Sequence, residues 1–145
     1  MKLTIELIPK SSFFVNVRST VEPLIWNKIR AKCYRRAKFR CEICGGQGPN
    51  HPVECHECFE YDEYWGVQRL TRLIALCPDC HRCKHFGLAT LHGKADEAIK
   101  HLMKINNISE MDAHCYLKGV AAEWERRNKI EWVLDLSYLD TYLDD

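Results

Sequence analysis

Two pairs of cysteines constrain this chain more than any other feature of its sequence. Cys41 and Cys44 form one C-x-x-C pair, and Cys77 and Cys80 form another farther along the chain. A two-residue spacer lets both sulfurs of a pair reach one ion, and structural zinc takes four such ligands in a tetrahedron. We therefore predict a structural zinc site on these four residues. The alternatives are four ordinary buried cysteines or a redox-active pair.

The cysteine content and the composition together indicate a cytoplasmic metal-binding domain. The chain has 145 residues, of which 46% are hydrophobic and 28% charged, as expected for a single globular domain. It holds nine cysteines, and C-x-x-C spacing in a reducing compartment indicates metal rather than disulfides. The N-terminus lacks the apolar core of a signal peptide, and no apolar stretch approaches the roughly 20 residues of a membrane span.

Two further cysteine pairs have the same spacing. Cys55-x-x-Cys58 lies between the zinc pairs, and Cys80-x-x-Cys83 overlaps the second of them. Cys80 cannot serve two tetrahedra without bridging them. Cys55 and Cys58 lie on a predicted strand, where successive side chains alternate between faces and the two sulfurs would diverge. A second zinc on Cys55, Cys58 and Cys83 is therefore the weaker alternative.

Hydrophobic periodicity predicts an α+β fold. We expect strands at residues 2–8, 52–61, 67–76 and 132–136, and helices at 23–38, 79–87, 94–106 and 109–128, with a turn and a short extended piece at 9–16. Ser19-x-x-Glu22 and Ser109-x-x-Asp112 resemble capping boxes, and Gly87 would end its helix. Cys33 and Cys115 lie on apolar helical faces, which indicates core positions.

Three histidines lie close to the predicted zinc pairs. His81 and His85 are four residues apart and would share one face of a helix. A strand that presented His56 toward that face would complete a site with three nitrogen ligands. Such a site can hold a divalent cation with open positions for water and phosphate.

A run of basic residues precedes the first zinc pair. Residues 1–50 carry ten Lys and Arg against three Glu, whereas residues 51–145 carry eleven against seventeen Asp and Glu. Seven of these cations fall within thirteen residues, interleaved with aromatic side chains: Lys28, Arg30, Lys32, Arg35, Arg36, Lys38 and Arg40. Such a cluster favours binding to nucleic-acid phosphates. The alternative is the solvated face of an amphipathic helix.

From about residue 26 to residue 87 the sequence resembles the HNH nucleases of the ββα-metal superfamily. The resemblance rests on Cys41-Glu42-x-Cys44-Gly45, on Val53-Glu54-Cys55-His56-Glu57 and on Leu73-x-x-Leu76-Cys77-x-x-Cys80-His81-x-x-Lys84-His85. It implies one domain over 1–145 with an HNH-like zinc core at 23–87. An N-terminal strand and helix would precede the ββα-metal unit, and a helical C-terminal extension would occupy 88–145.

The resemblance also implies roles for individual residues. In the family, two adjacent residues of the first strand act as metal ligand and general base. One alignment makes His56 the ligand and Glu57 the base, whereas a shift of one residue makes Cys55 the ligand and His56 the base. His81 and His85 match helix ligands. The family's middle Asn falls at Arg72, which departs from the pattern.

The function implied is a metal-dependent endonuclease that hydrolyses phosphodiester bonds, with DNA favoured over RNA. Catalysis would fall to His56, Glu57 and His81, with Mg²⁺ or another divalent ion on His56, His81 and His85. Phosphate contacts would come from Arg30, Arg35, Arg36, Lys38, Arg40, Arg72 and Lys84.

The alternative is a catalytically weak or inactive HNH-like module that binds nucleic acid or protein. The aromatic C-terminal extension would then serve a protein partner or a homodimer. A zinc-ribbon regulator would account for the cysteines but not for the Cys80–His85 run.

Overall fold

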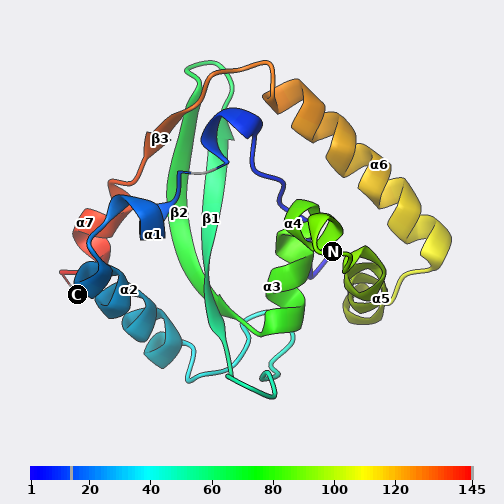
Figure 1. The fold of residues 1–145 in the computed structure, drawn as a ribbon, viewed down its shortest axis with the longest axis horizontal. Helices are drawn as coiled ribbons and strands as arrows, with labels where there is room; N and C mark the ends of the chain where they lie inside the picture. Colours follow the sequence, from blue (N-terminus) through cyan, green and yellow to red (C-terminus); the bar gives the residue numbers. More distant parts are fainter. Residues whose placement is uncertain (14, 145) are drawn as a thin grey trace.

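The computed structural model describes residues 1–13 and 15–144 and shows an α+β protein with helices on both faces of one sheet (Figure 1). The strands are β1 (Glu54–Asp62), β2 (Val67–Leu76) and β3 (Val133–Asp135). The helices are α1 (Val17–Thr20), α2 (Pro23–Arg36), α3 (Pro78–Lys84), α4 (Phe86–Leu91), α5 (Ala95–Asn106), α6 (Glu110–Arg127) and α7 (Tyr138–Tyr142), with a 3-10 turn η1 (Lys10–Ser12).

The β1–β2 hairpin is the centre of the fold, and it confirms the two predicted central strands. The strands pair antiparallel with His56 opposite Ile74 and Glu57 opposite Leu73. Ile74 belongs to the core shared with α3 and α5, whereas Leu73 belongs to the core shared with α2. Neighbouring strand residues point to opposite faces, so His56 and Glu57 face different cores.

The predicted N-terminal strand at residues 2–8 is wrong, because this segment forms no strand in the described structure. It runs beside helices rather than along a strand edge, so its amides bond to helical partners. The Ile5 amide donates to the Tyr116 hydroxyl at 2.9 Å, and the Glu6 amide donates to the Lys84 carbonyl at 3.0 Å. The backbone amides of this extended segment thus find hydrogen-bond partners without pairing to a β-strand.

The predicted helix at 79–87 is two helices. Helix α3 ends at Lys84 and α4 begins at Phe86, with His85 between them at φ −98° and ψ 53°. Gly87 therefore lies inside α4 and does not end a helix. The His85 amide still donates to the His81 carbonyl at 3.2 Å, which keeps the two histidines one turn apart.

The other predicted helices form with small shifts at their ends. Ser19 and Glu22 do not form the predicted box. Ser19 instead completes a capping box with Asn16 at α1, and Glu22 precedes α2 without a side-chain cap. Ser109 caps α6 by accepting from the Asp112 amide. Phe14, within the predicted 9–16 piece, lies outside the described residues.

The C-terminal extension packs on both faces of the sheet. Helix α5 covers α3, and the chain then returns through α6 to β3, which pairs parallel with β2. Helix α7 closes the α2 side, where Leu139 and Tyr142 are buried with Cys33. Cys115 is exposed on α6, so its predicted core position is wrong. No helix among the described residues is both long enough and apolar enough to cross a membrane.

Gly48 provides a test of how tightly the loops that carry the four cysteines pack. A Cβ at this position would lie 2.4 Å from the His51 carbonyl oxygen and 2.7 Å from Pro78 Cδ. We predict that Gly48→Ala lowers the free energy of unfolding by about 1–3 kcal/mol, measured by urea denaturation. Gly119→Ala is the control, since a Cβ in that α6 position meets no atom within 4 Å. It should be neutral or stabilise the helix by up to about 1 kcal/mol; equal losses in both variants would contradict the packing.

Candidate metal sites

Cys41, Cys44, Cys77 and Cys80 converge from two distant parts of the chain. Their sulfurs all lie within 4.8 Å of one another, and Cys44 Sγ is 3.7 Å from Cys77 Sγ. Zinc–sulfur bonds of about 2.3 Å would separate tetrahedral sulfurs by about 3.8 Å. The four cysteines therefore fit a metal ion such as zinc.

The backbone around these sulfurs is arranged as two matching turns. The Cys44 amide donates to Cys41 Sγ at 3.5 Å, and the Cys80 amide donates to Cys77 Sγ at the same distance. Gly45 takes a φ of +76°, which a residue without Cβ adopts most easily. Amide donors favour the thiolate over the thiol, so both turns suit metal-bound sulfur.

The pKa shifts of Cys41, Cys77 and Cys80 also indicate a need for a cation. Burial raises the pKa of Cys77 to about 11. A hydrogen bond from Cys80 lowers the pKa of Cys41, and the same bond raises the pKa of Cys80. Without a positive charge the cluster can thus carry few thiolates, whereas a divalent ion would stabilise all four.

The alternative second zinc does not form in the described structure. Cys55 packs in the core beside α2 and Cys58 packs against the opposite core, so the two sulfurs diverge as predicted. Cys83 is buried in α3, where its thiol donates to the Ala98 carbonyl at 3.1 Å.

His56, His81 and His85 form a second cluster, as their spacing predicted. A nitrogen from each ring lies within 4.8 Å of the others. The His81 and His85 Nε2 atoms are 3.1 Å apart. Two nitrogens on one zinc would be about 3.4 Å apart in a tetrahedron. The geometry is therefore compatible with a shared ion, while binding itself stays a prediction.

Two carboxylates hold the cluster from outside. Glu54 Oε1 lies 2.9 Å from His81 Nδ1, which leaves His81 Nε2 pointing to the other histidines. Glu6 Oε2 lies 2.5 Å from His56 Nε2. His56 Nδ1 is buried and has no hydrogen-bond partner among the described residues. A buried lone pair without a donor is what a metal ligand presents before its ion is bound.

The pKa shifts keep two of these rings neutral. Burial lowers the pKa of His56, although its hydrogen bond with Glu6 acts in the opposite direction. Burial, followed by the nearby His81 and His56, lowers the pKa of His85 to about 3. A neutral imidazole is the form that binds metal, so the cluster is prepared for a cation.

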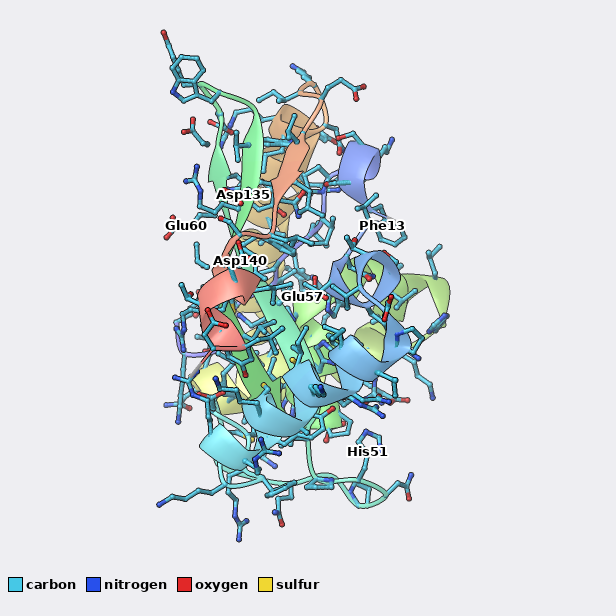
Figure 2. The ribbon with its side chains drawn as sticks, turned by 90° about the vertical axis from the view of Figure 1, so that its left-hand side faces the viewer. Phe13, His51, Glu57, Glu60, Asp135 and Asp140 are labelled. Atoms are coloured by element: carbon cyan, nitrogen blue, oxygen red, sulfur yellow. The ribbon has the colours of Figure 1, made fainter. Side chains whose placement is uncertain are left out.

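Glu57 does not join the histidine cluster. Its carboxylate oxygens accept from the Val17 amide at 3.3 and 3.4 Å, on the side of the sheet that α1 and α2 cover. Figure 2 shows Glu57 in the middle of the molecule. Burial raises the pKa of Glu57 to about 7. Its assignment as general base stays untested, but the geometry does not place it with His56.

The predicted phosphate-binding residues divide into two groups. The exposed side chains are Arg30, Arg35, Arg36, Lys38, Arg40 and Arg72, and no described carboxylate lies within ion-pairing distance of any of them. Lys84 is only 5% exposed and binds Thr4 and Glu6. It is therefore not available to a phosphate in this structure.

Sequence reasoning missed four residues that support the two clusters. Glu6 and Glu54 bind the histidines, and His51 reaches Glu54 Oε2 at 2.8 Å from an exposed loop (Figure 2). His101 on α5 lies 3.2 Å from Cys80 Sγ. Glu54 carried a signal, since it directly follows Val53 in the family-like motif. Glu6 and His101 carried none, because their partners lie 50 and 21 residues away, whereas His51 is only three residues from Glu54.

A cleft of about 800 Å³ has Glu6 and Glu57 in its wall, whereas none of the three histidines lines it. It lies between residues 5–8, the outer edge of β1 and α6.

Comparison of the chain with protein-family models, with curated proteins and with solved structures returned no significant match.

We predict about one tightly bound zinc per chain in the isolated protein, because four convergent thiolates bind this ion strongly. Cys80→Ser should abolish zinc binding and cooperative unfolding, as measured by elemental analysis and thermal denaturation. Cys83→Ser is the matched control, since Cys83 lies one turn farther along α3 and outside the cluster. A folded wild-type protein without metal, or equal zinc loss in both variants, would contradict the site.

Proposed function

We propose that this protein is a metal-dependent nuclease of the HNH type that hydrolyses phosphodiester bonds. The observation that carries the proposal is the convergence of His56 on β1 with His81 and His85 at α3, on a hairpin whose flanking segments bring four cysteines together. The cysteines would hold structural zinc. The histidines would hold a second divalent ion, with the exposed side of the cluster left for substrate.

The residues of the histidine cluster suit this chemistry. His81 and His85 would ligate through Nε2 and His56 through its unpartnered Nδ1. A bound divalent ion supplies Lewis-acid stabilisation of phosphate charge and activates water. Glu54 would keep His81 in the tautomer that ligates. The Glu57 carboxylate accepts from the Val17 amide and lies outside the histidine group, which favours His56 over Glu57 as the residue that acts there.

A polyanionic substrate agrees with the charge of α2 and the turn after it. Arg30, Arg35 and Arg36 are exposed on α2, and Lys38 and Arg40 continue the row toward the cysteine cluster. Cations without ion-pair partners bind phosphates with release of counterions. The preference for DNA over RNA rests on the family resemblance.

Cleavage tests the proposal directly. Incubated with supercoiled plasmid, the protein should nick DNA with Mg²⁺ or Mn²⁺ and lose this activity in EDTA. His81→Ala and His85→Ala should each reduce the rate more than about a hundredfold, because each removes a ligand. His92→Ala is the control, since His92 is exposed at the end of α4. If no divalent ion supports nicking, the chain is a binding module instead.

In the same assay, replacement of His56 distinguishes a metal ligand from a general base. As a ligand, its replacement by Ala should remove both the second ion and cleavage. If His56→Ala loses cleavage but keeps the second ion, His56 is the base and not a ligand. Glu57→Gln should have a mild effect on the rate, and a loss of cleavage with intact metal would restore Glu57 as the base.

Nucleic-acid affinity should depend on the basic row of α2. We predict that Arg35→Glu combined with Arg36→Glu weakens DNA binding and reduces the slope of log affinity against log salt by about 2, measured by fluorescence anisotropy. Lys100→Glu with Lys104→Glu is the matched control, because both lysines are exposed on α5. An equal change of slope in both double variants would mean that the affinity is not local to α2.

A further inference from the structure

We propose that Glu6 is a positioning residue of the histidine cluster: its carboxylate holds the Nε2–H of His56 and leaves Nδ1 as the nitrogen that acts in the site. The inference deepens the proposed function and rests on it. It concerns the tautomer of one side chain, however, and this can be measured whether or not the protein cleaves nucleic acid.

The tautomer follows from which atoms can donate. An ionised carboxylate accepts hydrogen bonds and donates none, whereas a neutral imidazole donates from one nitrogen only. Glu6 Oε2 lies 2.5 Å from His56 Nε2, so the proton must be on Nε2. The side chain of His56 is 1% exposed, and its Nδ1 has no partner among the described residues. Nδ1 is thus the free acceptor.

Glu6 is itself held in place from two sides. Lys84 Nζ lies 3.4 Å from Glu6 Oε1 and donates to Thr4 Oγ1 at 2.7 Å. The Glu6 amide in turn donates to the Lys84 carbonyl at 3.0 Å. Lys84 is buried at the end of α3, three residues after His81 and directly before His85. This reciprocal clamp fixes the N-terminal segment to the end of α3, which carries His81 and leads into His85.

A comparison with His81 shows why a second carboxylate is required. Glu54 occupies Nδ1 of His81, and Glu6 occupies Nε2 of His56. The two rings meet edge to face, with centroids 5.3 Å apart at 74°. Each carboxylate thus takes one nitrogen of its ring, and the other nitrogen has no carboxylate partner. Without Glu6, one nitrogen of His56 would be a buried donor with no acceptor, which is unfavourable.

The experiment measures the His56 tautomer by long-range ¹H–¹⁵N NMR on zinc-loaded protein, and then titrates Co²⁺ while recording visible absorption. Wild type should show the proton on Nε2. Glu6→Gln should keep this tautomer, because the amide oxygen still accepts. Glu6→Ala should lose it and weaken Co²⁺ binding at the histidines by about 10–100-fold, with Glu6→Gln in between.

Glu60→Gln and Glu60→Ala are matched controls, because Glu60 is an exposed glutamate on β1, the strand that carries His56, and lies at the periphery in Figure 2. Neither should change the tautomer or the Co²⁺ affinity. A wild-type proton on Nδ1, or a wild-type tautomer retained in Glu6→Ala, would overturn the inference. If the histidines of the wild type bind no Co²⁺, the proposed function fails while the tautomer result still decides the role of Glu6.

Discussion

Four thiols from two chain segments meet at one point, and the rest of the structure depends on that contact. A hairpin of two strands has little stability of its own, and β3 adds only residues 133–135 to this sheet. The cysteine cluster joins the turn after α2 to the end of β2 and the start of α3. Burial raises the pKa of Cys77 to about 11, so the cluster gains most from a bound cation. Metal binding and folding are then one equilibrium.

The cysteine cluster also orients the histidines, because the two are continuous in the chain. Cys77 caps α3 through its sulfur, Pro78 occupies the first turn, and His81 directly follows Cys80. The rotation of α3 about its axis is thus set at the cysteines, and His85 lies one turn later. The opposite wall is set by β1, whose pairing with β2 fixes His56 opposite Ile74. The cysteine cluster therefore shapes the histidine cluster.

The sequence predicted those parts of the site that depend on local spacing. C-x-x-C pairs, histidines four residues apart and a hairpin of two apolar strands each follow from the geometry of a single element. The outcome for Lys84 shows the limit of this reasoning. Its place after His81 suggested a phosphate contact, yet it is buried against Thr4 and Glu6. Which face of α3 is exposed depends on the N-terminal segment, which is distant in sequence.

The same dependence on contacts that are distant in sequence explains why the N-terminal segment forms no strand. Its alternation is real, since Leu3 and Ile5 are buried in the core with α5. An alternation of apolar and polar residues shows that a chain is extended and has two faces, but it does not show what lies beside the edges of that chain. Here helices lie beside it, so no ladder forms, and the second face meets buried groups of α3 and β1 instead of water. A glutamate that the pattern assigns to solvent thus binds His56, and the site is built from three separate parts of the chain.

The alternation of β1 bears on the choice between the two alignments with the HNH pattern. Both alignments take adjacent strand residues as ligand and base, but adjacent residues face opposite sides of a strand. His56 faces α3, whereas Cys55 packs on the α2 side and Glu57 accepts from the Val17 amide, and neither belongs to the candidate metal group of His81 and His85. The candidate metal group with His81 and His85 therefore takes His56 alone from β1, and the choice between the two alignments stays a prediction. The structure adds Glu6 to the groups around His56, since its Oε2 lies 2.5 Å from His56 Nε2, and it does so from outside the hairpin and the helix that follows it.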